Sequence, residues 1–437
     1  MLAAALGGCA GGGATTGASP IVQPAVPGTG GTPSTPAPTG APATPTPVPT
    51  ATPVPTATPV PAPAANPALH VPSGFIVSTI ASVSGARELA ALPNGDLIVG
   101  TSGSSVVIVP NAESAGAAGA PATFATMPDS PAQGVAYGGG YVFVATQHGV
   151  YRIPYSTGAH GGTPAKIASV RTGTVAPNSD GDVHTTSSVA VSGSTLYVGV
   201  GSSCNACAEV DPTRATVQKM ALDGSGMTTQ AKRFRNAIAL ATDPATGNVW
   251  AGGAGQDSLP QPHPYEFVDA VSTRTAPADY GWPDCEENRV AYKQGADCSA
   301  VVVPMLEFPA YSTIIGAAFY PASQSGPYAF PAAWRGGLFA GIHGSWHTGA
   351  GGVPIDPPHV AFVPFSGAAP ARAVSWSDPT AQWNDFFSGF QNAAGARIGR
   401  PTGVAVGAQG SLFVADDGAG AIYRIRPAGT AASSVRR

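Results

Sequence analysis

The sequence predicts an all-β protein, a six-bladed β-propeller preceded by a disordered Pro/Thr-rich N-terminal tether. Six stretches of alternating apolar residues recur along the chain, and each contains a turn. Their spacing of about 45–90 residues and their period of two are typical of propeller blades. Only 10% of the residues are charged, and 57 Gly and 45 Pro suit a sheet-rich protein with many turns. The six stretches begin at Arg87, Gln133, His184, Arg235, Ser312 and Arg400.

The first residues resemble the end of a bacterial lipoprotein signal, because apolar residues 2–6 lead into Leu6-Gly7-Gly8-Cys9. No Lys or Arg precedes them. We expect residues 1–9 to be a lipoprotein signal with a lipobox, and Cys9 to carry lipid after export. The protein would then be a membrane-anchored bacterial lipoprotein, periplasmic or displayed on the cell surface. The alternative is that Cys9 is a chance residue of a Gly/Ala-rich leader.

A tether is predicted at residues 10–69. The first 86 residues contain no Asp, Glu, Lys or Arg. They cannot bury enough surface to offset the entropy of ordering, so we expect them to be disordered. The Pro/Thr repeat at residues 47–61 favours polyproline II, and the tether could reach roughly 100–180 Å. The propeller domain is placed at residues 70–428 and a C-terminal tail at 429–437.

Each apolar stretch predicts antiparallel strands joined by a turn. The Asn94-Gly95 pair is a strong type I′ hairpin signal in the first blade. Residues 149–155 and 418–427 predict third strands of the second and last blades, whereas residues 381–391 favour a short helix. Long insertions often shape the functional face of a protein, and here they lie at residues 257–311 and 347–399.

A polar or charged residue precedes nearly every stretch. If the blades are related by rotation, these residues form one ring at one mouth of the central channel. In a chain with so few charges, such a ring would be a concentrated polar site. The net charge of −4 gives no indication of nucleic-acid binding. The predicted ring contains Arg87, Glu88, Gln133, His184, Arg235, Asn236, Thr313 and Arg400.

Four cysteines remain if Cys9 is lipidated. An even number in an exported protein favours disulfides, and proximity in the sequence favours the pairs Cys204–Cys207 and Cys285–Cys298. Metal or redox chemistry is the alternative for the C-x-x-C pair. A zinc site would want a second closely spaced pair, and haem attachment would need a His where Ala208 stands.

Taken in order, the motifs resemble the sorbosone/glucose dehydrogenase family, the soluble sugar dehydrogenases that use pyrroloquinoline quinone (PQQ). The resemblance covers roughly residues 72–428. Its specificity comes from the order and spacing of several motifs. They are His184 before LYVGVGSSCNAC, then DPTRAT, RFRN, DPATGNVW, GQDSLPQPHPYEF, DYGWPDC, FPAAWRGGLF, HGSW and GRPTGVAV followed by GSLFVADDGAGAIYRI.

The resemblance implies a six-bladed propeller and the oxidation of an aldose or related sugar aldehyde. His184 would be the general base that takes the proton of the anomeric hydroxyl while hydride passes to C5 of the quinone. Calcium would support the quinone, with Asp257 and Glu266 as the matching carboxylates. The residues implied to bind PQQ are Arg235, Asn236, Gln256, Trp346 and Arg400.

The chain departs from the family pattern in its positive charges. Gln256 stands where the family often has Arg, and Ser187 replaces an Arg three residues after the base. After HGSW, His347-Thr348 stands where Asn-Arg is usual. These changes put cofactor binding in question and favour an alternative, a non-catalytic propeller that binds a glycan or protein partner. A metal-dependent lactonase-like propeller ranks last, because it would want several carboxylates in the ring. The sugar, the electron acceptor and the oligomeric state are not predicted.

Overall fold

The computed structural model describes residue 64 and residues 66–170, 184–185, 187–285, 287–349 and 352–429. The predicted lipidation of Cys9, nearly all of the tether and most of the C-terminal tail lie outside these residues. Among the described residues, no helix has both the length and the apolar character needed to cross a membrane.

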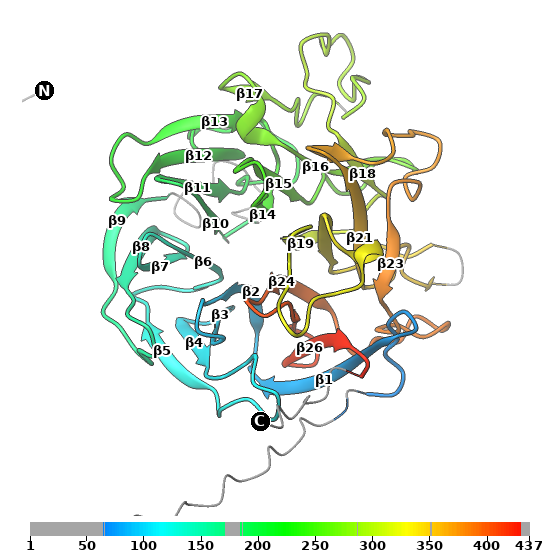
Figure 1. The fold of residues 1–437 in the computed structure, drawn as a ribbon. Coiled ribbons are helices and arrows are strands. Elements are labelled where there is room, and N and C mark those ends of the chain that lie inside the picture. The colour runs from blue at the N-terminus through cyan, green and yellow to red at the C-terminus, as the bar shows by residue number, and fades with distance from the viewer. Residues whose placement is uncertain are drawn as a thin grey trace, which may run out of the picture. The chain divides into compact units, whose positions relative to one another are not determined.

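Six sheets, antiparallel except where β17 pairs with β13, surround a central axis, which confirms the predicted six-bladed propeller (Figure 1). The first blade contains β2 (Ala86–Ala91), β3 (Leu97–Thr101), β4 (Ser105–Val109) and β5 (Ala122–Thr126). The second contains β6 (Gly134–Gly138), β7 (Tyr141–Ala145), β8 (Gly149–Pro154) and β9 (Ala165–Ser169).

The strands of the third and fourth blades do not follow one another in simple chain order. The strand β17 belongs to the third blade but comes after the first strands of the fourth. The third contains β10 (Ser187–Ser192), β11 (Thr195–Val200), β12 (Thr216–Ala221), β13 (Thr228–Lys232) and β17 (Ala278–Asp279). The fourth contains β14 (Ala237–Thr242), β15 (Val249–Gly253), β16 (Glu266–Asp269) and β18 (Leu306–Phe308).

The fifth blade contains β19 (Ile314–Tyr320), β20 (Gly337–Ile342), β21 (His359–Ser366), β22 (Ala369–Pro370) and β23 (Asn384–Phe387). The helix predicted at residues 381–391 is wrong, because β23 lies there and pairs with β21. The helical turns in the described part of the chain are short 3₁₀ turns at Val271–Thr273 and Ala332–Trp334.

The sixth blade is closed by the two ends of the domain. It contains β24 (Pro401–Val406), β25 (Leu412–Asp416), β26 (Ala421–Pro427) and β1 (Phe75–Ser82), and β1 pairs antiparallel with β26. The expectation that all of the first 86 residues are disordered is therefore wrong for β1. Its register with β26 is fixed from Phe75 opposite Pro427 to Ser82 opposite Ala421.

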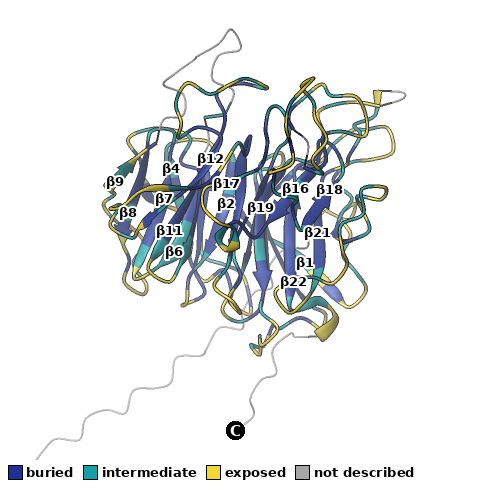
Figure 2. Ribbon diagram, turned by 90° about the horizontal axis from the view of Figure 1, so that it is seen from above, coloured by how far each residue is buried: buried dark blue, intermediate teal, exposed yellow. Residues whose placement is uncertain are grey.

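Apolar side chains between neighbouring blades form the core. Among the described residues, six large clusters each join two adjacent blades, so the core follows the ring. Figure 2 shows that the buried residues are concentrated in the strands. Strand alternation produces this arrangement, because successive side chains point to opposite faces of a blade and each face meets another blade.

The inner strands of neighbouring blades approach closely where one of them carries glycine. A Cβ added to Gly134 in β6 would lie 2.5 Å from the carbonyl oxygen of Ser187 in the next blade. Gly316 in β19 and Gly403 in β24 face the next inner strand in the same way. These contacts bring the beginnings of the inner strands, and the polar residues beside them, around one narrow channel.

Candidate functional site

One end of the channel holds a cavity of about 230 Å³ that gathers most of the predicted ring. The opposite end opens into a cavity of about 410 Å³ whose walls come from all six inner strands, β2, β6, β10, β14, β19 and β24. The blades are therefore related by rotation, as predicted. The walls of the smaller cavity are Arg87, His184, Arg235, Asn236, Ile238, Ala254, Gly255, Asp257, Glu266, Tyr311, Thr313, Ile315, His343 and Trp346.

His184 is held as a neutral imidazole with a defined tautomer. Its Nδ1 lies 3.0 Å from the carbonyl oxygen of Ser202 and 2.8 Å from the Ser202 hydroxyl oxygen. A carbonyl oxygen only accepts hydrogen bonds, so Nδ1 carries the proton and Nε2 carries the lone pair. Burial lowers the pKa of His184 well below its ordinary value, and the nearby Arg235 lowers it further. These are the properties of a base that stays unprotonated near neutral pH.

Arg235 is buried beside this base and donates all of its N–H groups to the protein. Its Nε donates to the Asn205 carbonyl oxygen at 3.0 Å, and its Nη1 donates to the carbonyl oxygens of Gly255 and Ala254. Its Nη2 donates to Asn205 Oδ1 and to Asp257 Oδ2, each at 2.9 Å. Burial lowers the pKa of Arg235, and Asp257 opposes that shift. Arg235 therefore contributes positive charge to the cavity without a spare hydrogen-bond donor.

The two carboxylates implied as calcium ligands both line the cavity but already have partners. Asp257 Oδ1 accepts from His347 Nε2 at 3.0 Å, while its other oxygen pairs with Arg235. Glu266 accepts the backbone N–H groups of Thr313 and Gly255. Burial raises the pKa of Glu266 to about 8.

These carboxylates do not fit calcium as they stand. Among the described residues, the one group of three or more His, Cys, Asp or Glu side chains with ligand atoms within 4.8 Å is Cys204, Cys207 and Glu209. The two sulfurs of that group are joined in a disulfide. A metal at Asp257 would also lie beside the guanidinium of Arg235, which opposes its binding.

Two polar groups at the wall retain capacity for an anionic ligand. Arg87 donates through Nη1 to Asp417 at 2.7 Å and through Nε to Gln133 at 3.0 Å, and Nη2 has no hydrogen-bond partner among the described residues. The Oδ1 atom of Asn236 is buried without a partner in the same part of the chain. These groups fit a polycarboxylate such as PQQ, because a guanidinium pairs well with carboxylates and an amide can turn its N–H₂ toward one.

His343 and Asp417 extend this polar wall. His343 Nε2 lies 2.9 Å from Asp417 Oδ1, and the other oxygen of Asp417 binds Arg87. Burial lowers the pKa of His343 to about 4 despite that carboxylate. From sequence, Asp417 reads as a turn residue at a strand end. Its position opposite Arg87 depends on closure of the ring between the sixth and first blades, which local pattern does not reveal.

Tyr311 and Trp346, which both line the cavity, each pack a ring against His347. The ring of His347 lies between Tyr311, with centroids 3.9 Å apart, and Trp346, with centroids 3.8 Å apart. Trp346 is 64% exposed, so the stack runs from the interior to the surface. Sequence reasoning missed Tyr311 because it lies in an insertion. Asn205 was missed because the cysteines around it dominated that motif.

Two of the residues implied to bind PQQ do not line this cavity. Gln256 borders a separate cavity of about 30 Å³ together with Glu266 and Trp282. Arg400 packs behind His343, where it donates to the carbonyl oxygens of His343 and Gly344 at 3.0 and 2.9 Å. The disulfides Cys204–Cys207 and Cys285–Cys298 are both formed, as predicted.

Comparison with known proteins places this geometry in a family. A family profile described as TrAA12-like matches residues 69–428. The PQQ domain of pyranose dehydrogenase from Coprinopsis cinerea, in its holo form, has 17% identity and a TM-score of 0.65, covering 84% of this chain and 98% of that one. A Carbohydrate-Active Enzymes Family AA12 protein from Trichoderma reesei has 18% identity and a TM-score of 0.67, covering 85% and 100%.

A third solved structure, the PQQ-bound aldose sugar dehydrogenase from Streptomyces coelicolor, has 18% identity and a TM-score of 0.53. It covers 82% of this chain and 99% of that chain. At these identities the solved structures establish the propeller fold. No curated protein matches the chain.

Proposed function

The chain belongs to the TrAA12-like family, and from this premise we propose that it oxidises an aldose or a related sugar aldehyde with PQQ as its cofactor. The observation that carries the proposal is the single cavity in which a neutral His184 faces the same space as Arg87 and Arg235. A base that takes the hydroxyl proton and a cationic wall are the two features required when hydride passes from the carbon bearing that hydroxyl to an anionic quinone.

Bound PQQ would be the acceptor of the two electrons. Arg87 would hold a carboxylate through Nη2, and Asn236 would donate its amide N–H₂ to the cofactor. Arg235, whose donors are committed, would act through its charge by stabilising negative charge that develops beside it. His184 would accept the proton of the sugar hydroxyl at Nε2, while Ser202 keeps the other nitrogen protonated.

Calcium remains a prediction with no assigned step, because Asp257 and Glu266 are engaged with other partners. A calcium structure of the Trichoderma reesei AA12 protein is the reason to test it. Titration of the protein with PQQ in the presence of Ca²⁺ and of a chelator decides the matter. Equal affinity in both conditions would remove calcium from the site.

Export and lipid anchoring through Cys9 are likewise proposed from the sequence pattern. Incorporation of labelled fatty acid by the full chain, and its loss in Cys9→Ser, would support the anchor. Unchanged release of Cys9→Ser and of the unaltered chain into the soluble fraction would contradict it.

The test of function uses the protein that begins at Asn66, with PQQ added. We expect a shift of the quinone absorbance on binding and reduction of an artificial electron acceptor with at least one aldose of a panel. A protein that binds PQQ but oxidises no sugar would point to another alcohol or aldehyde substrate. A protein that binds neither PQQ nor a metal would favour the non-catalytic binding module.

A further inference from the structure

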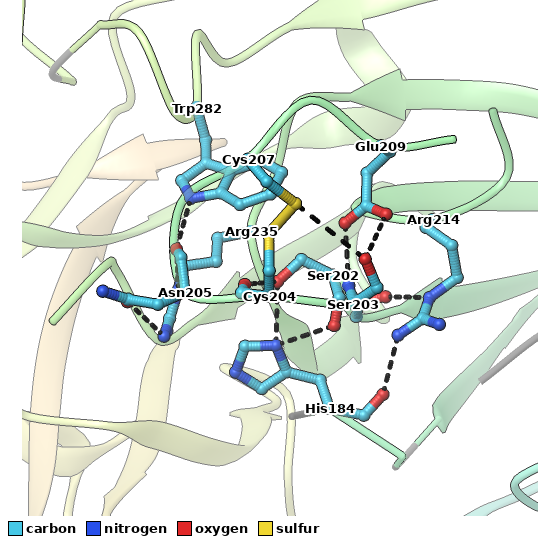
Figure 3. The surroundings of a disulfide bond; sticks show 11 residues. His184, Ser202, Ser203, Cys204, Asn205, Cys207, Glu209, Arg214, Arg235 and Trp282 are labelled. Atoms are coloured by element: carbon cyan, nitrogen blue, oxygen red, sulfur yellow. Dashed lines mark hydrogen bonds between the residues drawn. A yellow bond between two sulfur atoms is a disulfide. The ribbon is translucent and has the colours of Figure 1, made fainter. Parts of the chain in front are cut away.

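One short loop contacts both His184 and Arg235. It follows β11, runs from Ser202 to Cys207, and is closed by the Cys204–Cys207 disulfide (Figure 3). Cys204 is fully buried, while Cys207 is partly exposed. The loop therefore lies between the surface and the two side chains on which the proposed chemistry depends.

The first half of the loop fixes the base. The Ser202 hydroxyl donates to the Cys204 carbonyl oxygen at 2.7 Å. Its hydrogen is thereby committed, so Ser202 Oγ presents a lone pair to His184 Nδ1 beside the Ser202 carbonyl oxygen. The position of the Cys204 carbonyl thus decides whether the Ser202 hydroxyl accepts a hydrogen bond from His184 Nδ1 or is free to donate one to it.

The second half of the loop fixes the arginine. Asn205 accepts from Arg235 twice, through its carbonyl oxygen and through Oδ1, in a bidentate arrangement. The same Oδ1 accepts the backbone N–H of Asp257 at 2.7 Å, and Nδ2 donates to the Asp257 carbonyl oxygen at 3.1 Å. The indole N–H of Trp282 also donates to the Asn205 carbonyl oxygen, at 3.0 Å. Asn205 therefore joins Arg235 to its counter-ion.

We propose that the loop closed by Cys204–Cys207 is the positioning element of the cavity, with Asn205 as the residue that holds Arg235 and Asp257 in place. The inference rests on the proposed function. Opening the disulfide would free the backbone that carries the Cys204 carbonyl and both Asn205 acceptors. The base and the arginine would then lose their fixed orientation together.

A role for this pair as a catalytic dithiol does not fit its surroundings. The Glu209 carboxylate lies close to both sulfurs. Its oxygens accept from the backbone N–H and the hydroxyl of Ser203, at 2.7 and 2.8 Å. A negative charge beside the sulfurs disfavours a thiolate, whereas reactive cysteine pairs lie in electropositive sites that lower the thiol pKa.

The first experiment compares two disulfides of the protein that begins at Asn66. Cys204→Ser with Cys207→Ser should weaken PQQ binding by roughly tenfold or more, as expected for the loss of charged hydrogen bonds. The matched control, Cys285→Ser with Cys298→Ser, opens the longer loop and should lower the melting temperature while the Kd for PQQ stays within about twofold. Equal losses of affinity in both double variants would overturn the proposal.

Asn205→Ala keeps the disulfide and tests the positioning role if the double variant does not fold. It should also weaken PQQ binding by roughly tenfold, and it should broaden the NMR signal of the Arg235 Nε–H, identified by its loss in Arg235→Lys. Wild-type affinity together with an unchanged Arg235 signal would show that Asn205 positions nothing.

A readout without cofactor separates this inference from the proposed function. The imidazole ¹⁵N spectrum of the cofactor-free wild type should show His184 as the Nδ1–H tautomer, and the signal is assigned with His184→Gln. Opening Cys204–Cys207 should shift His184 toward the other tautomer. If the wild type binds no PQQ, the proposed function fails, yet this comparison still decides the inference. Identical His184 spectra with and without the disulfide would refute it.

Discussion

The imidazole of His184 meets a carbonyl and a hydroxyl on one nitrogen, and this pair of acceptors decides which nitrogen is basic. Burial and the positive charge of Arg235 then keep the ring neutral. The proposed base is thus prepared by two separate effects, a hydrogen bond that selects the tautomer and an environment that excludes the second proton.

Replacement of His184 by Gln should remove the base while keeping a polar side chain of similar size. We expect kcat for sugar oxidation to fall by about 10²–10⁴-fold with little change in the Kd for PQQ. Stopped-flow reduction of the bound quinone measures the step directly. His160→Gln, at an exposed position, is the matched control and should retain full activity. Turnover by His184→Gln at the wild-type rate would remove His184 from the mechanism.

The pH dependence of kcat should reflect the lowered pKa of His184. An ordinary histidine is half protonated near pH 6.5, whereas the pKa of this one lies well below that value. We therefore expect kcat to stay constant as the pH falls from about 8 to about 6.5, and to decline only in more acidic solution. A steady-state pH profile provides the measurement. A half-maximal point at about 6.5 would show that the ring is not held neutral as the geometry indicates.

Glu88 is buried near the channel, and its Oε1 has no partner among the described residues. Burial raises its pKa from 4.5 to about 8, although Arg87 opposes the shift. A raised folded-state pKa means that the stabilising contribution is complete below about pH 4.5 and is lost as the pH rises through about 8. The glutamine of Glu88→Gln cannot ionise, so this variant does not lose stability in this way. The difference between its melting temperature and that of the wild type should therefore increase from about pH 5 to about pH 9. A constant difference would contradict this assignment.

Much of the site could be predicted at the level of single residues. The polar residue before each apolar stretch marks the channel mouth, so His184, Arg235 and Asn236 were correctly placed together in one cavity. Gln256 and Arg400 were not, because the direction of a side chain depends on loop conformation. Arg400 turns toward two backbone carbonyls of the neighbouring blade, and that contact leaves no mark in the local sequence.

At the scale of strands, the alternation of apolar residues indicates where the inner strands lie, and glycine stands where neighbouring inner strands come closest. The hairpin predicted at Asn94-Gly95 joins β2 to β3, and the predicted third strands of the second and last blades are β8 and β26. The type I′ turn was wrong, because Gly95 has a positive φ and Asn94 does not, and Leu92 pairs with Asp96 across a longer turn. The strand β1 was missed because its partner β26 lies at the other end of the domain. The helix expected at residues 381–391 was wrong because pairing with β21 overrides local propensity.

Gly134→Ala tests the close approach of the inner strands. Its Cβ would lie 2.5 Å from the Ser187 carbonyl oxygen and 2.7 Å from Cα of Ser188. The backbones of β6 and β10 must move apart to make room, so we expect the free energy of unfolding to fall by about 1–3 kcal/mol. Gly103→Ala is the control, since the nearest heavy atom would be 3.7 Å away. Denaturant unfolding of both variants measures the difference, and equal stability would contradict the tight packing.

The whole molecule is held as a ring by the pairing of β1 with β26. Phe75 of β1 packs edge-on against Phe330 and Phe386, with ring centroids 4.7 and 5.2 Å away. The closing strand therefore contributes both hydrogen bonds and an aromatic anchor to the fifth and sixth blades.

Removal of β1 should open the ring. A protein that begins at Ser84 lacks β1, so the edge of β26 would be exposed and the site of Phe75 would be empty. A protein that begins at Asn66 retains β1 and Phe75. We expect the shorter protein to aggregate or to lose at least the roughly 3–5 kcal/mol that a buried Phe contributes. Calorimetry compares them, with Phe75→Ala as an intermediate case. Equal melting temperatures would show that the domain does not depend on this closure.

The same closure governs biosynthesis. Translation releases β1 first, but its partner does not exist until the ribosome has passed Pro427. The nascent polypeptide must therefore carry an unpaired apolar strand until β26 has been synthesised, and chaperones would have to protect that strand during this time. A premature stop codon within β26 should consequently be as damaging as one in the middle of the domain.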